Sequence, residues 1–166
     1  MNIDFDIDED RVMDLYINEN LAIERLVMEW VEHGKLIIAY DYDGTVFDYH
    51  NTGNRFYYVT ELLRECEDIG ANFIVYSCSP KSRHQEMKDY LDSRKIPWDK
   101  INEPIIELAD GTGKIFFNIL LDDRAGLNTS YLILDRAVQI MKGKPKDKAE
   151  ACKMLKERFK VKCRIE

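Results

Sequence analysis

The stretch from residue 37 to residue 46 reads IIAYDYDGTV, an apolar run that leads directly into two acids. Continuous apolar runs of this length are typical of strands that are buried on both faces of a parallel sheet. Asp41 and Asp43 are two residues apart, so they point to the same side of an extended backbone. Gly44 permits a sharp exit from the strand. The stretch therefore predicts two carboxylates at the end of a central strand.

Two further apolar runs, at residues 73–76 and 115–121, also predict buried strands. The spacing of the apolar residues, together with the positions of the turn residues, predicts helices over residues 8–32, 56–68, 82–94, 129–141 and 146–159. Residues 96–101 are expected to form a short strand or an irregular segment, and residues 161–165 a last edge strand. The alternation indicates an α/β fold, a Rossmann-like three-layer sandwich with a mostly parallel central sheet. We expect one domain, made of a helical extension (1–34), a motif-bearing core (35–142) and a C-terminal helix and tail (143–166).

A second pair of acids, Asp122 and Asp123, directly follows the apolar run 115–121. Ligands of parallel α/β sheets lie beyond the carboxyl ends of the strands. Four carboxylates that meet there would repel one another and would favour a divalent cation with oxygen ligands, above all Mg²⁺. Each pair alone also fits a simpler interpretation, a turn for the first and a helix cap for the second. Two pairs at equivalent strand ends favour the metal site.

These segments together resemble the motifs of the haloacid dehalogenase superfamily. Residues 41–46 match its first motif, an Asp-x-Asp pattern after an apolar strand. Ser77 matches the second motif, a Ser or Thr that closes the next core strand, although taken alone it also fits an ordinary Ser-Pro turn. Asp122 and Asp123 match the fourth motif, an acid pair. The resemblance covers roughly residues 35–142, by motif order and spacing.

The third motif of this superfamily is a lysine. Lys114 precedes the last core strand, as the lysine of similar small members does, and is our choice. Lys100 and Lys81 are the alternatives, because the chain is rich in lysine.

The resemblance implies a magnesium-dependent phosphohydrolase that works through an aspartyl-phosphate. Asp41 is the expected nucleophile and Asp43 the general acid and base. Mg²⁺ is expected to be bound by Asp41, by the backbone carbonyl of Asp43 and by Asp122. Asp123 is expected either to contact the ion directly or to contact one of its ligands. The resemblance implies that Gly44, Thr45, Ser77 and Lys114 bind the substrate. Thr45 is also expected to support the loop around Asp43.

The intervals between the motifs are too short to hold a cap domain, so we expect a capless member with an open site. Such a site suits a large substrate or a lid from another subunit. The loop at residues 47–51 is expected to act as a small flap, and His50 in it is expected to be an exposed loop residue.

Composition sets the remaining expectations. The net charge of −7 gives no general attraction to nucleic acid, which makes a nucleic-acid substrate less favoured without excluding it. No apolar run approaches the ~20 residues of a membrane span. The four cysteines form no CxxC pair, so we expect no zinc site, reduced thiols and a cytoplasmic protein. The resemblance implies a phosphorylated substrate, and both a monomer and an oligomer stay open.

Three other interpretations stay open at this level. The fold could bind phosphate or a partner without catalysis, or it could serve as a nucleotide or nucleic-acid-end phosphatase. A structural α/β protein with acidic strand ends would bind no Mg²⁺.

Overall fold

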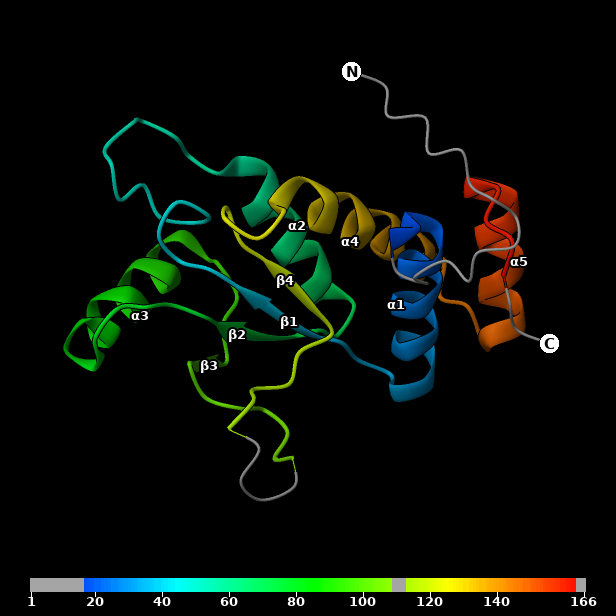
Figure 1. Ribbon diagram of the computed structural model, residues 1–166, viewed down its shortest axis with the longest axis horizontal. Coiled ribbons are helices and arrows are strands. Elements are labelled where there is room, and N and C mark those ends of the chain that lie inside the picture. The colour runs from blue at the N-terminus through cyan, green and yellow to red at the C-terminus, as the bar shows by residue number, and fades with distance from the viewer. Residues whose placement is uncertain (1–16, 109–112, 164–166) are drawn as a thin grey trace.

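The computed structural model describes residues 17–108 and 113–163. Its centre is a four-stranded, all-parallel sheet with the strand order β3-β2-β1-β4 (Figure 1). The strands are short, and they are β1 Ile37–Tyr40, β2 Asn72–Val75, β3 Lys100–Ile101 and β4 Ile119–Leu121. The prediction of an α/β fold with a parallel central sheet is confirmed.

The strand order creates a topological switch point beside β1. The chain moves from β1 to β2 and β3 on one side, and β4 is placed on the other side of β1. Tyr40 is in register with both Val75 and Leu121, so three neighbouring strands end at the same level. The residues that follow these strands share the crevice in which parallel α/β sheets bind ligands.

The described residues form five α-helices. These are α1 Glu19–His33, α2 Tyr57–Asp68, α3 His84–Arg94, α4 Leu127–Met141 and α5 Lys148–Phe159. A short 3-10 helix, η2 Lys81–Arg83, leads into α3. The side chain of Asn18 caps α1 by accepting a hydrogen bond from the N–H of Asn20, and Gly34 ends the helix at φ 69°. The predicted helices are therefore present with shifted ends, while residues 8–16 lie outside the described residues. None of the helices in the described ranges has the length and apolarity needed to cross a membrane.

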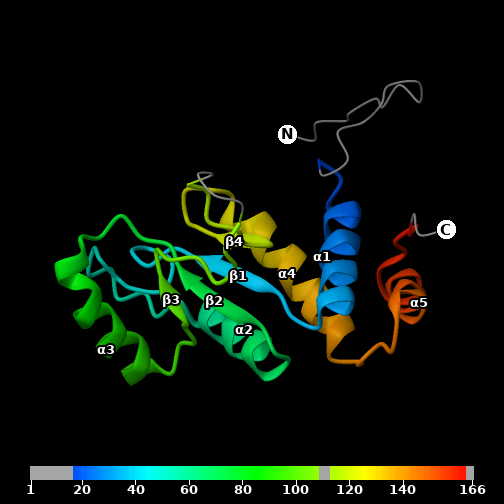
Figure 2. The ribbon, with the colours of Figure 1, turned by 90° about the horizontal axis from the view of Figure 1, so that it is seen from below.

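The two faces of the sheet are covered differently. Ile38, Tyr40 and the residues aligned with them join a large core that includes buried residues of all five α-helices. The opposite face has a small apolar cluster, which residues of the segments 102–108 and 113–118 cover on the side away from α2 (Figure 2). Its members from the strands and the segment are Ile37, Ala39, Ile74, Ile105, Ile115, Phe117 and Leu120. Among the described residues, the third layer of the expected sandwich is thus a connecting segment.

Two strand predictions differ from the structure. The run 115–121 was expected to be extended throughout, but only its last three residues form β4. The backbone and side chain of Asn118 bond to the carbonyl and the N–H of Ile37, where β1 begins, so earlier residues have no strand partner. The predicted edge strand at 161–165 is also wrong for residues 161–163, which are not strand. Its last two residues lie outside the described part.

Candidate functional site

Three carboxylates converge at the carboxyl ends of β1 and β4. One oxygen each of Asp41, Asp122 and Asp123 lies within 4.8 Å of the others. The N–H of Asp41 donates to the carbonyl of Leu121 at 2.9 Å, which ties the end of β1 to the end of β4. The N–H of Arg124 donates to the Asp122 carboxylate at 2.8 Å and fixes its orientation. The sheet therefore brings together the two acid segments that the sequence separates by about 80 residues.

The electrostatics of this group favour a bound cation. Burial, followed by the charge of Asp122, raises the pKa of Asp41 to about 6, and Asp123 and Asp43 add to the rise. No lysine or arginine of the described residues is among the groups that shift this pKa. Asp41 and Asp122 are partly buried and Asp123 is exposed. Like charges this close are costly, and a divalent ion with oxygen ligands is the group that relieves that cost.

The loop between β1 and α2 approaches the second acid pair closely. Gly44 adopts φ 84°, and a Cβ on it would lie 3.0 Å from Oδ2 of Asp123. The fully buried Thr45 accepts a hydrogen bond from the N–H of Asp123 on its Oγ1, at 3.2 Å. Gly44 and Thr45 therefore act structurally in setting the distance between the first and the second acid pair.

Asp43 has a different environment from the other three acids. Its carboxylate is not part of the converging group, and its Oδ1 is buried without a hydrogen-bond partner among the described residues. Its Oδ2 accepts a long hydrogen bond, 3.5 Å, from the hydroxyl of Ser79. The backbone N–H groups of this loop donate to the carbonyls of Tyr42 and Phe47. In the described part of the chain, no backbone N–H donates to the carbonyl of Asp43. Both groups are thus available to a ligand.

Ser77 lies buried just beyond β2. Its N–H and carbonyl are both bonded to the side-chain amide of Asn102, at 2.9 and 2.6 Å. Its Oγ accepts from the N–H of Ser79 at 3.0 Å, which leaves the hydroxyl proton free to be donated. The sequence analysis missed Asn102 and Ser79, since no pattern in the sequence links Asn102 to the end of β2.

None of the three lysines considered for the third motif contacts the aspartates within the described ranges. Lys114 and Lys81 are exposed, and Lys100 pairs with Glu103 at 3.9 Å. Arg83 was not singled out from the sequence, yet its guanidinium donates to the Ser79 hydroxyl at 3.3 Å. The signal for it was its position in the turn that follows Ser77.

The predicted flap is an ordered loop. The Asp48 carboxylate accepts hydrogen bonds from the N–H and hydroxyl of Thr52 and from the N–H of Gly53, at 2.7 to 2.9 Å. These bonds, that from the Thr52 N–H first, hold the pKa of Asp48 below its ordinary value. His50 is exposed, as expected, and its ring contacts that of Tyr49 edge-on.

Comparison with protein-family models and with curated proteins finds no match. Among solved structures, a conserved protein coded by a locus of Bacteroides thetaiotaomicron is similar, with a TM-score of 0.50 and 21% identity. The match covers 66% of this chain and 92% of the other. At this identity the likeness shows the α/β fold alone.

Proposed function

We propose that this protein is a magnesium-dependent phosphomonoesterase, a capless phosphatase similar to the haloacid dehalogenase superfamily. The observation that carries the proposal is the convergence of Asp41, Asp122 and Asp123 within 4.8 Å at the switch point of the sheet. The free Cys thiols fit work in the cytoplasm.

The donor set fits Mg²⁺ rather than a softer ion. It consists of three carboxylates, with the Asp43 carbonyl nearby in sequence and unused by backbone donors of the described residues. Hard oxygen donors of this kind suit Mg²⁺, which also keeps several waters and binds phosphate oxygens. When bound, the ion would supply charge neutralisation and a template for the phosphoryl group.

The chain's own residues would carry the chemistry in two steps. An oxygen of Asp41 attacks phosphorus, the bond to the ester oxygen breaks, and Asp43 gives its proton to the leaving alcohol. In the second step Asp43 takes a proton from water, whose oxygen attacks phosphorus and displaces the Asp41 carboxylate. The unpaired, buried Oδ1 of Asp43 supports this role, because a buried polar atom without a partner is costly unless a ligand or proton completes it.

Donors for the phosphoryl oxygens would come from the turn after β2. The free proton of Ser77 is one, and Arg83 supplies a positive charge that reaches Ser79 and, through it, Asp43. Lys114 remains the proposed third-motif lysine, and its exposed side chain would have to approach the aspartates from residues 113–118. Preorganised donors of this kind account for most of the acceleration in phosphoryl transfer.

Hydrolysis of p-nitrophenyl phosphate with Mg²⁺ tests the proposal. Asp41→Asn should abolish turnover, and Asp43→Asn should lower kcat by roughly 100-fold or more, the usual contribution of a general acid. Asp68→Asn is the matched control, since it makes the same change on an exposed residue at the end of α2. EDTA should stop the wild-type reaction. Equal rates in wild type and Asp41→Asn would reject the nucleophile, and Mg²⁺ binding without turnover of any phosphate ester would favour a non-catalytic phosphate-binding module.

A further inference from the structure

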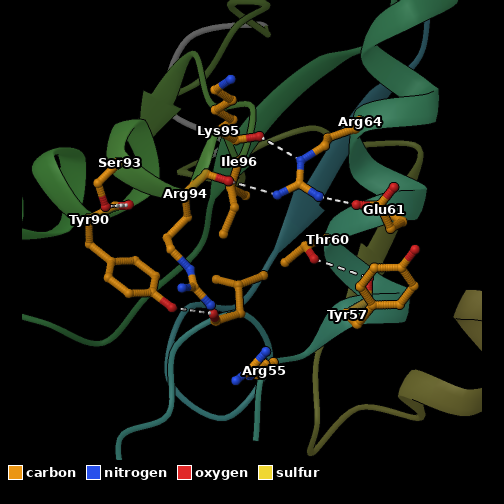
Figure 3. A pocket seen from close by; sticks show the side chains of 11 residues that line it. Arg55, Tyr57, Thr60, Glu61, Arg64, Tyr90, Ser93, Arg94, Lys95 and Ile96 are labelled. Carbon is orange, nitrogen blue, oxygen red and sulfur yellow. Dashed lines mark hydrogen bonds and ion pairs between the residues drawn. The ribbon is translucent and has the colours of Figure 1, made fainter.

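A cavity of about 340 Å³ lies between α2 and α3 and contains none of the four aspartates. We name it the α2–α3 cavity. It is lined by residues of the loop before α2, of both helices and of the segment that follows α3, and its position is shown in Figure 3. The volume falls at the lower end of the range for small-molecule sites.

The charge of this cavity is opposite to that of the protein. Its lining holds Arg55, Arg64, Arg94 and Lys95 against the single carboxylate of Glu61, a net charge of +3 in a chain of −7. Such local reversal of charge is a feature of sites that attract anions.

The side chain of one of these cations, Arg64, has a structural role. Arg64 is ion-paired with Glu61, and it donates to the carbonyls of Lys95 and Arg94 at 2.9 and 2.7 Å, which caps the end of α3. Within residues 17–108 and 113–163, Arg55, Arg94 and Lys95 have no carboxylate within ion-pair distance. Arg55 and Arg94 therefore line this cavity without an ion-pair partner in the described part of the protein, while the Lys95 side chain runs away from them (Figure 3).

The start of α2 adds to the same field. Phe56 precedes the helix at φ 48°, no side chain caps it, and its first turn holds no acid. The N-terminal end of a 12-residue helix carries a partial positive charge and free N–H groups that suit an anion. Arg55 lies directly before this end. Tyr57, the first residue of the helix, lines the cavity and is 63% exposed, and its ring contacts that of Tyr58 edge-on.

We propose that the α2–α3 cavity binds a nucleotide, with its phosphate held by Arg55 and Arg94 and its base against Tyr57. The phosphate accounts for the unpaired cations and for the uncapped helix end. The exposed tyrosine ring supplies the flat surface on which a base stacks. The site is separate from the aspartate centre and does not depend on the proposed phosphatase activity.

Calorimetric titration of the full chain with AMP tests this site. EDTA keeps the aspartate centre free of metal, and the Asp41→Asn variant, which should bind AMP as the wild type does, separates the two sites. Arg55→Gln and Arg94→Gln should each weaken binding roughly tenfold, the loss of one charge-assisted contact. Arg158→Gln, an exposed arginine on α5, is the matched control and should leave binding unchanged.

Two further ligands test the parts of the nucleotide. Ribose 5-phosphate should bind several-fold more weakly than AMP to the wild type, and Tyr57→Leu should remove that difference. Adenosine should bind poorly, and added salt should weaken AMP binding. Failure of AMP to bind, or AMP binding by both arginine variants as tight as that of the wild type, would overturn the proposal. Equal affinity for ribose 5-phosphate and AMP would overturn the assignment of the base to Tyr57.

Discussion

Replacement of Asp41 by asparagine should stabilise the metal-free protein, although most substitutions at partly buried sites destabilise. Burial and the neighbouring Asp122 raise the pKa of Asp41 from 3.8 to about 6. At 1.36 kcal/mol per unit, a shift of about 2 units corresponds to roughly 3 kcal/mol. Because the side chain is only partly buried, water screens these charges, and we expect about half of that value, ~1.5 kcal/mol, at neutral pH.

The pH dependence of this gain has a defined sign. The carboxyl of Asp41 titrates at a higher pH in the folded protein than in the unfolded chain, so the folded state binds more protons between about pH 4 and pH 6. The penalty is therefore fully present at pH 7 and is lost as the pH falls through this window. The advantage of Asp41→Asn over the wild type should shrink accordingly.

Urea denaturation in EDTA, at neutral pH and near pH 4, measures both quantities, with Asp68→Asn as the control for the chemical change. Mg²⁺ at about 100 times its Kd should add ~2.7 kcal/mol to the wild type, equivalent to roughly 5–10 °C in Tm for a domain of this size. Asp41→Asn should gain much less. A variant that is less stable than the wild type in EDTA, together with no effect of Mg²⁺ on the wild type, would refute the reasoning.

Three substitutions test the supports of the sites. Gly44→Ala should cost about 1–2 kcal/mol and weaken Mg²⁺ binding, because φ is 84° and the new Cβ would meet Asp123 at 3.0 Å; denaturation and Mg²⁺ titration measure the two effects. Thr45→Val should cost about 1 kcal/mol in urea denaturation, since it removes the acceptor for the Asp123 N–H, and an unchanged stability would contradict that bond. Arg64→Met should cost about 1–2 kcal/mol by the same measurement through loss of the cap on α3, and its proteolysis should begin near residue 95.

The sequence was sufficient where a local pattern determines structure. The apolar run before Asp41 and the acids after both strands predicted a parallel sheet and a meeting of carboxylates at its edge. Three of the four carboxylates do meet, because parallel strands in register end at one level. Asp43 differs because it lies beyond the strand, in a loop whose hydrogen bonds turn its side chain toward Ser79.

The features that the sequence did not predict depend on contacts between distant segments. Asn102 holds Ser77 from the end of β3, and nothing near either residue indicates that pairing. The same holds for the α2–α3 cavity, whose cations come from a loop, a helix interior and a helix end. The positions of these arginines and lysines in the sequence show no periodic pattern. Only the packing of α3 beside α2 brings them together.

The loop at residues 42–47, which carries Asp43, is held more firmly than Arg83, the cation proposed to meet the phosphate. Tyr42 stacks on Phe47 at 4.9 Å between ring centroids, Tyr90 of α3 contacts both rings edge-on, and its hydroxyl donates to the Val46 carbonyl at 3.1 Å. Packing of this kind fixes the position of the loop that carries Asp43. Arg83, by contrast, is held by a 3.3 Å bond and a 3.7 Å ion pair near the surface. A rigid acidic centre beside adjustable cations suits a site in which the geometry around the metal is constant and the fit to the phosphate ester is made as it binds.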